Sequence, residues 1–271
     1  MSEESDFGID PSDIVLLDQL ARGAYGVVYK GVIRGKTYAI KVQEEVPAQE
    51  EQVNILVELS LLKTLKHERL VASSGSARII EKRSPFEVKI MIAMELCDNG
   101  ALRECLARNL SWDLRIRIAL DVIEGINYMH DNKIVHRDIK TTNILITSDW
   151  RAKVCDFSFA CHIENLSKHD YVYGTDEFMA PEIALGEDFG TAADIFSYGI
   201  VLAEMISGQE PSATFLRRSA RDLFALDEEE LKAAVLPECP DSMEALTLMC
   251  CEKEGEFRIT AAEVFDWLQA L

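Results

Sequence analysis

Short runs of apolar and β-branched residues, broken by turn-forming stretches, fill the first third of the chain and predict β-strands there. The stretches ARGAY and RGK separate the first three runs, and a segment with helical spacing precedes two further runs. The expected strands span residues 14–20, 26–33, 36–43, 69–80 and 88–96, and the expected helix spans 52–66. The pattern therefore predicts a β-rich region that contains one main helix.

After CDNG (97–100) the pattern becomes helical. Leu114 begins an apolar row that continues at positions 118, 122 and 126, and Ser111 stands where an N-cap is expected. Residues 192–207 are apolar nearly all round, as in a buried central helix, and helices are also expected over 243–251 and 261–271. We therefore expect a bilobal α+β fold with an N-terminal extension (1–13), a small β-rich lobe (14–96) and a larger, mostly α-helical lobe (97–271).

Composition narrows the cellular setting. The 271 residues carry 28 Lys and Arg against 47 Asp and Glu, a net charge of −19, which argues against nonspecific binding to nucleic acid or anionic membranes. We find no long apolar span, signal peptide or lipidation signal, so no membrane anchor is expected. The seven cysteines are scattered without a CxxC, which favours a reducing, cytoplasmic setting over a disulfide framework or zinc site.

A glycine-containing stretch, LARGAYGVVY (20–29), joins the first two expected strands. Gly23 and Gly26 allow a tight turn and a close approach of the backbone to a ligand, and backbone N–H groups in such a turn can bind phosphate oxygens. A plain glycine hairpin explains this stretch equally well on its own.

Lys41 ends the strand motif YAIK, in which Tyr38 and Ile40 share one face and Ala39 and Lys41 share the other. A solvated strand lysine is the simpler interpretation of this segment alone. Glu58 changes it, because this carboxylate lies on the edge of the apolar helical row Leu61, Leu62 and Leu65. An inward carboxylate needs a cation, so we expect Lys41 and Glu58 to pair and to present an ammonium group to a phosphate.

The stretch IVHRDIKTTNILI (134–146) places charged groups between two apolar runs. A turn at 148–150 would fold 144–147 against 152–155 and bring Asn143 close to Asp156. An amide and a carboxylate suit Mg²⁺, Asp138 could then accept a hydroxyl proton, and Lys140 could offset phosphate charge. For each aspartate taken singly, a turn cap is an equally good explanation.

These motifs together resemble the eukaryotic protein kinases over residues 14 to 270. In the order of the sequence, the motifs are LARGAYGVV, YAIK, Glu58, HRDIKTTN (136–143), DFS (156–158), GTDEFMAPE (174–182), DIFSYG (194–199) and Arg258. Lys140, two residues after Asp138, and Thr175 are typical of serine/threonine kinases. The helical segments of the second lobe look most like the tyrosine-kinase-like group.

The resemblance implies a serine/threonine protein kinase that transfers the γ-phosphate of ATP to protein hydroxyls. Asp138 would be the base, with Lys140, Lys41 and Glu58 as further catalytic groups. Asn143 and Asp156 would bind Mg²⁺, with Mn²⁺ as an alternative ion. The implied nucleotide-binding residues are Leu20, Ala21, Arg22, Gly23, Ala24, Tyr25, Gly26, Val27, Val28, Ala39, Lys41, Met94, Glu95 and Cys97.

The resemblance also implies contacts that hold the site. Asp194 would hold the backbone of the catalytic loop, and Glu182 would pair with Arg258 to secure the activation segment. Protein substrates are the implied partners, and an upstream kinase or trans-autophosphorylation would modify the activation segment at the candidate sites Ser167, Tyr171 and Tyr173.

Two positions depart from the family pattern. Ala21 replaces the first glycine of the loop, and Ser158 replaces the glycine after Asp-Phe. Glycine at the second position allows backbone flips that serine resists. These departures support one alternative, a pseudokinase or weakly active kinase that acts as a nucleotide-binding signalling scaffold.

Overall fold

The computed structural model describes residues 8–23, 26–44, 49–80, 88–166 and 174–271. The chain divides into two units, Met1–Asp98 and Asn99–Leu271, and each is described by itself. Residues 45–48, 81–87 and 167–173 lie outside the described residues.

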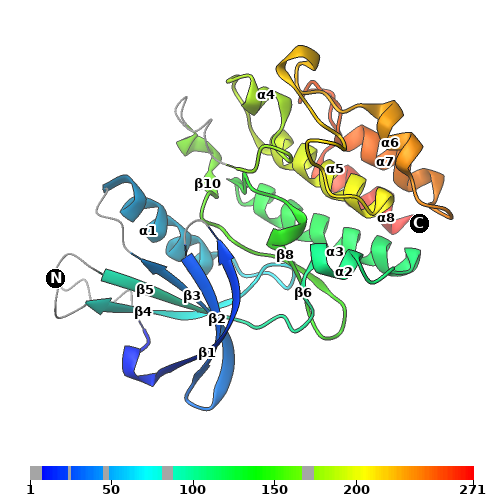
Figure 1. Cartoon of the computed structure of the whole chain (residues 1–271). Helices are drawn as coiled ribbons and strands as arrows, with labels where there is room; N and C mark the ends of the chain where they lie inside the picture. Colours follow the sequence, from blue (N-terminus) through cyan, green and yellow to red (C-terminus); the bar gives the residue numbers. More distant parts are fainter. Residues whose placement is uncertain (1–7, 24–25, 45–48, 81–87, 167–173) are drawn as a thin grey trace. The chain divides into compact units, whose positions relative to one another are not determined.

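The first unit is built on an antiparallel sheet with strand order β1-β2-β3-β5-β4 (Figure 1). Its described helix is α1, Gln49–Thr64. A 3₁₀ turn, η2 (Pro11–Asp13), leads into the sheet. The strands are β1 (Ile14–Gly23), β2 (Gly26–Ile33), β3 (Lys36–Glu44), β4 (Ser73–Ile80) and β5 (Val88–Met94).

The turn between β2 and β3 fixes the register of the lysine strand. Ile33 pairs with Lys36 across the two residues Arg34 and Gly35, whose φ angles are +48° and +80°. Two consecutive positive φ angles are typical of the tight hairpin turns that match strand twist. From this turn the register runs to Lys41, which pairs with Val28.

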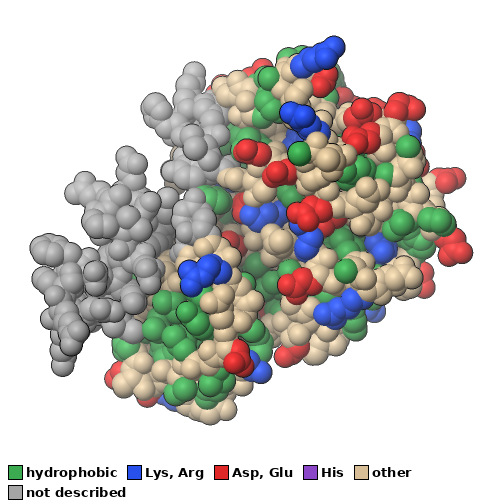
Figure 2. Space-filling model, viewed as in Figure 1, with side chains coloured by type: hydrophobic (Ala, Val, Ile, Leu, Met, Phe, Trp, Pro, Cys, Tyr) green, Lys and Arg blue, Asp and Glu red, His purple; other side chains and the backbone are tan. Residues whose placement is uncertain are grey.

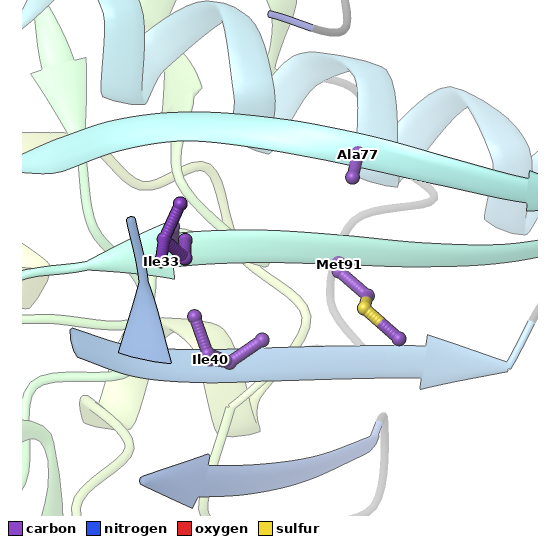
Figure 3. Packing of buried hydrophobic residues seen from close by; sticks show 5 residues of the cluster. Ile33, Ile40, Ala77 and Met91 are labelled. Carbon is purple, nitrogen blue, oxygen red and sulfur yellow. The ribbon is translucent and has the colours of Figure 1, made fainter. Parts of the chain in front are cut away.

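The core of this unit lies against the sheet. Figure 3 shows Ile33, Ile40, Ala77 and Met91 projecting from strands β2 to β5. Ile40 and Ala77 are fully buried, and Tyr38 packs against the same cluster. Tyr38 and Ile40 therefore share the apolar face of β3, as the alternation predicted.

Helices dominate the second unit. Figure 1 shows α5 among the surrounding helices. Within this unit, three short strands form one small sheet, ordered β6-β8-β9, and β10 pairs with β7. The helices are α2 (Leu102–Leu106), α3 (Trp112–Asp131), α4 (Pro181–Ala184), α5 (Thr191–Ser207), α6 (Glu228–Ala234), α7 (Asp241–Cys250) and α8 (Ala261–Gln269). The strands are β6 (Gly100–Ala101), β7 (Ile134–Val135), β8 (Ile144–Ile146), β9 (Ala152–Val154) and β10 (Cys161–His162), and the remaining turns are η3 (Thr141–Asn143), η4 (Ile163–Asn165) and η6 (Ala220–Asp222).

The predicted helix signals are confirmed. Ser111 caps α3 by accepting a hydrogen bond from the Leu114 N–H. The helix α5 is buried from Ala193 to Ser207, as its apolar sequence predicted. Each expected strand and helix has a counterpart, and the α+β fold class is confirmed.

Two further findings concern the surface. Among the described residues, no helix combines the length and the apolar character needed to cross a membrane. On the face shown in Figure 2, Asp and Glu side chains of the second unit are interspersed with Lys and Arg. The net charge of −19 is therefore not gathered into a single acidic surface on that face.

Gly199 sets how closely α5 approaches the end of α7. A Cβ at this position would lie 2.5 Å from Cys251 Sγ and 2.8 Å from Cys250 Cβ. Such distances are far below van der Waals contact, so only glycine allows this packing.

We expect Gly199→Ala to lower the free energy of unfolding by about 1–2 kcal/mol. Alanine gains about 1 kcal/mol of helix propensity, but overpacking a tight core costs about 1–3 kcal/mol, and the upper part of this range, about 2–3 kcal/mol, applies here because part of the clash involves the backbone of Cys250. Chemical denaturation measures the difference. Gly8→Ala is the matched control, because a Cβ there meets nothing within 4 Å; a Gly199→Ala protein as stable as this control would contradict the packing argument.

Candidate functional site

A buried ion pair joins β3 to α1 in the first unit. Lys41 Nζ donates to Glu58 Oε1 at 2.7 Å, and the two residues are 8% and 2% exposed. Glu58 shares the inner face of α1 with the buried Leu62, and the buried Leu65 follows directly after the end of the helix. The structure thus brings together the two residues that strand alternation and helical spacing had paired, and the pair fixes the ammonium group of Lys41.

Gln43 belongs to the same cluster, and the sequence analysis missed it. It lies two residues after Lys41 on β3, on the same face, and is 3% exposed. Its Nε2 donates to Glu58 Oε2 at 3.1 Å, so each carboxylate oxygen of Glu58 has its own donor. The sequence signal that could have identified Gln43 is a polar residue two positions after Lys41, on the same face of the strand.

The glycine loop forms a hairpin in which Gly23 pairs with Gly26. Ala24 and Tyr25, at its tip, lie outside the described residues. Gly26 has φ +153°, and a Cβ there would lie 2.4 Å from the carbonyl oxygen of Val42. Glycine is therefore required at 26 by backbone strain and by contact with β3, whatever the loop binds.

The other expected nucleotide-binding residues lie on the sheet and just after it. Leu20, Ala21 and Arg22 are exposed on β1, and Val27 and Val28 are half-buried on β2. Ala21 is not among the residues with positive φ, so its methyl group adds no backbone strain.

The chain continues from the end of β5 into residues 95–97. Met94 pairs with the buried Ala39, and Cys97 is also buried. The Glu95 N–H donates to Ala72 O at 3.0 Å, and Glu95 Oε1 accepts from the Ala72 N–H at 2.7 Å. These bonds fix the backbone at 95.

In the second unit, the predicted hairpin forms between β8 and β9, with Ile144 opposite Val154. Asn143 directly precedes β8, and Asp156 lies two residues after the end of β9. The Cys155 N–H donates to Asn143 O at 2.9 Å, and this bond holds Asn143 close to Asp156. Asn143 ends the 3₁₀ turn η3 and is 7% exposed.

Asp138 is the centre of a dense hydrogen-bond cluster. Its Oδ1 accepts from Thr175 Oγ1 at 2.8 Å. Its Oδ2 accepts from Asn143 Nδ2 and lies next to Lys140 Nζ, both at 2.8 Å. Lys140 Nζ also donates to Thr175 Oγ1 at 2.7 Å. A carboxylate that is 5% exposed is thereby held between a cation, an amide and a hydroxyl.

Asp156 is held in an unusual conformation, with φ +63°. Ser158 Oγ donates to Asp156 Oδ1 at 2.6 Å. His136 Nε2 lies 3.0 Å from Cys155 O, and its ring centroid lies 5.6 Å from that of Phe157. Non-glycine residues with positive φ cost about 1–3 kcal/mol and gather at functional sites, so surrounding contacts must enforce this geometry.

Asp194 on α5 holds the loop that precedes Asp138. Its carboxylate accepts from the N–H groups of His136 at 2.8 Å and Arg137 at 2.9 Å, and His130 Nε2 lies 2.9 Å away. Burial alone would raise the pKa of Asp194, but the hydrogen bond and charge of His130 and the His136 N–H hold it below its usual value. The expected hold on the catalytic loop is confirmed.

The expected ion pair that secures the activation segment also forms. Arg258 donates to both carboxylate oxygens of Glu182, at 2.8 and 3.1 Å, and the Arg258 side chain is fully buried. The candidate phosphorylation sites Ser167, Tyr171 and Tyr173 lie outside the described residues.

A further polar network, which was not expected from the sequence, supports η3. Thr141 Oγ1 donates to Glu204 Oε2 at 2.8 Å, and Arg103 Nε lies 2.8 Å from Glu204 Oε1. Burial raises the pKa of Glu204 to about 7, against the opposing effects of Arg103 and Thr141. The network ties the catalytic loop to α2 and α5.

The donor set fits magnesium. Asn143 and Asp156 offer an amide oxygen and a carboxylate, and Mg²⁺ commonly takes one or two protein ligands and fills its remaining positions with water and phosphate. Among the residues that the structure describes, no group of three or more His, Cys, Asp or Glu side chains is arranged so that it could hold a metal ion. Two protein ligands would leave the remaining positions of such an ion to water or phosphate.

Comparison with known proteins agrees with this geometry. Three proteins of Dictyostelium discoideum are similar along nearly the whole chain. "RasGEF domain-containing serine/threonine-protein kinase X" is 34% identical over 256 residues, which cover 93% of this chain and 26% of that protein. "Probable serine/threonine-protein kinase kinX" is 33% identical over 274 residues, covering 98% and 24%. "Probable serine/threonine-protein kinase kinY" is 31% identical over 288 residues, covering 100% and 49%.

The chain thus spans about a quarter to a half of the length of these relatives. A family model, "Protein kinase domain", matches residues 14–267. The resemblance inferred from the motifs is confirmed at the level of the family, whereas the tyrosine-kinase-like subgroup stays a prediction. Because the match covers most of the chain, with each described site residue named above, the chain belongs to the protein kinase domain family.

Proposed function

We propose that this chain is an active serine/threonine protein kinase domain, which transfers the γ-phosphate of ATP to Ser or Thr hydroxyls of proteins. One observation carries the proposal. Thr175 Oγ1 donates to Asp138 Oδ1 at 2.8 Å while it accepts from Lys140 Nζ at 2.7 Å. A threonine hydroxyl thus already lies within the distance at which a general base can accept its proton.

The roles in the second unit follow from these contacts. Asp138 accepts the proton of the substrate hydroxyl, and Asn143 orients the Asp138 carboxylate through its amide (2.8 Å). Lys140 offsets the negative charge that develops on the transferred phosphoryl oxygens. Thr175 and Lys140 favour serine or threonine as the acceptor.

The remaining roles concern the nucleotide. Lys41, fixed by Glu58 at 2.7 Å, contacts the α- and β-phosphates, and residues 20–28 with Ala39, Met94, Glu95 and Cys97 bind ATP. Asn143 and Asp156 bind Mg²⁺, or Mn²⁺ in its place. When bound, the metal ion supplies neutralisation of phosphate charge.

One contact favours the alternative of a pseudokinase or weakly active kinase. Ser158 Oγ donates to Asp156 Oδ1 at 2.6 Å, and so occupies an oxygen that a metal ion would use. A hydroxyl bond is nevertheless exchangeable, since charge-assisted ligation by Mg²⁺ is stronger than a single hydrogen bond to serine. We therefore retain the active kinase as the main proposal.

The setting is part of the same proposal. We place the domain in the cytoplasm, which its scattered cysteines favour. Its partners are protein substrates, together with an upstream kinase or a second copy that phosphorylates the activation segment.

A transfer assay with labelled ATP, Mg²⁺ and a degenerate peptide library with a central serine or threonine tests the proposal. Labelled phosphoserine or phosphothreonine is the expected result. Nucleotide binding without transfer to any peptide would support the scaffold and contradict the active kinase.

Asp138→Asn is expected to lower turnover about 10²–10⁴-fold, the usual contribution of a general base, and to leave ATP affinity unchanged. Steady-state kinetics and nucleotide titration separate the two effects. Asp266→Asn is the matched control, since Asp266 is exposed on α8. If Asp138→Asn turned over like this control, the role of Asp138 would be wrong.

Gln43 allows a test of the cluster formed by Lys41, Glu58 and Gln43. The test separates an effect on the position of the Lys41 ammonium group from an effect on the free energy of unfolding. Its bond to the Glu58 carboxylate contributes about 1.5–3 kcal/mol. Its Oε1 is buried and has no hydrogen-bond partner among the described residues, which costs about 1–3 kcal/mol. These two terms nearly cancel, so Gln43 adds little net stability while it fixes one oxygen of Glu58.

Gln43→Met removes both terms and keeps the side-chain volume. We expect the free energy of unfolding to change by less than about 1 kcal/mol, while the KM for MgATP rises by up to about tenfold, because the lost hydrogen bond no longer fixes Glu58 and Lys41 and tenfold corresponds to about 1.4 kcal/mol. Gln19→Met, on the exposed face of β1, is the control. An unchanged KM at unchanged stability would rule out a positioning effect of Gln43.

A further inference from the structure

Arg218 binds the backbone that follows Thr175, although it lies outside every motif of the family resemblance. Its Nη2 donates to the carbonyl oxygens of Asp176 and Glu177, both at 3.0 Å. Its Nη1 donates to Met179 O at 2.6 Å and to Phe224 O at 3.2 Å. One guanidinium group therefore holds three carbonyl groups of a four-residue stretch.

The fourth carbonyl group of this stretch is also held by a side chain. Ser197 Oγ on α5 donates to Phe178 O at 2.8 Å. Within the loop, the Phe178 N–H donates to Thr175 O at 2.9 Å, and the Met179 N–H donates to Asp176 O at 3.4 Å. The turn that begins at Thr175 is thus fixed by its own backbone hydrogen bonds and by the side chains of Arg218 and Ser197.

The surroundings of Arg218 suit a guanidinium group. Its Cζ lies 4.8 Å from the centroid of the Phe196 ring, and Arg258 Cζ lies 5.1 Å from the same centroid. Burial lowers the pKa of Arg218 to about 10, so the group stays protonated near neutral pH. A planar fork with donors on two nitrogens can reach carbonyl groups on both sides, which a lysine ammonium cannot do.

Thr175 connects this backbone to the site, because its hydroxyl bonds both Asp138 and Lys140. A shift of the stretch 176–179 therefore moves a hydroxyl that contacts the proposed base. We infer that Arg218 is a positioning residue, which sets the backbone at 176–179 so that Thr175 and the acceptor protein are aligned with Asp138. This inference rests on the proposed kinase activity.

The test compares Arg218→Met with Arg217→Met in the full chain. Both variants remove one positive charge from neighbouring positions, but Arg217 is exposed and makes no hydrogen bond or ion pair among the described residues. The measurements are kcat and KM for the peptide library, KM for MgATP, and amide hydrogen exchange at 175–179.

For Arg218→Met we expect kcat/KM for peptide to fall about tenfold to a hundredfold, because small misplacements of reacting groups lower reaction rates by such factors. KM for MgATP should stay within about twofold of the parent, and the amides at 178 and 179 should exchange faster. Arg217→Met should match the parent in all measurements. Peptide kinetics equal to the parent, or equal losses for peptide and MgATP, would overturn the inference.

Arg218→Lys keeps the charge and covers the case in which the methionine variant does not fold. We expect it to show faster exchange at 178 and 179 and a peptide kcat/KM below the parent; unchanged exchange and kinetics would refute the positioning role. If the parent itself transfers no phosphate to peptide, the proposed function fails, whereas the exchange measurement still decides whether Arg218 holds the loop.

Discussion

A buried carboxylate on α5, Asp194, is the constraint on which the geometry of the second unit depends. It is 1% exposed, and burying an ionised carboxylate is costly unless donors surround it. The donors are the N–H groups of His136 and Arg137, and Arg137 has φ +67°. The carboxylate therefore stabilises a strained backbone, and the strain in turn directs Asp138, the next residue, towards Asn143 and Lys140.

The same helix supplies the other supports of the site. Ser197 follows Asp194 by one helical turn, and Glu204 lies two turns beyond Ser197, so all three share one face of α5. Asp194 holds the backbone before Asp138, Ser197 binds the loop after Thr175, and Glu204 binds Thr141 in η3. An otherwise apolar helix thus carries a row of polar side chains, each hydrogen-bonded to a segment of the candidate site. This arrangement explains why α5 is buried although it is not purely hydrophobic.

The helices and strands, the ion pair of the first unit and the β8–β9 hairpin of the second unit could be predicted because their signals are local. Strand alternation placed Lys41, the apolar row of α1 placed Glu58, and a turn between two short runs gave the hairpin that joins Asn143 to Asp156. Gln43 also carries a local signal, since it shares a strand face with Lys41, although its contact with Glu58 was not expected. Glu204 and Arg218 could not be predicted in the same way. Glu204 contacts Thr141 across 63 residues of sequence, and Arg218 binds carbonyl oxygens 39 to 42 residues away. Contacts over such separations, and contacts to backbone carbonyl groups, cannot be inferred from the local pattern of side chains. Family resemblance did not help either, because these positions lie outside its motifs.

The contacts of Asp138 also determine how an acceptor could approach under the proposed function. An ionised carboxylate offers about four lone-pair sites, two on each oxygen. Asn143 and Lys140 occupy Oδ2, whereas among the described residues Thr175 alone binds Oδ1. A substrate hydroxyl would therefore reach Oδ1 beside Thr175. The position of Thr175 then decides which side of the base stays accessible, and this position is set by a backbone whose carbonyl groups are held by Arg218 and Ser197. Under the proposed function, alignment of the acceptor would thus depend on α5 and on Arg218 as well as on Asp138 itself.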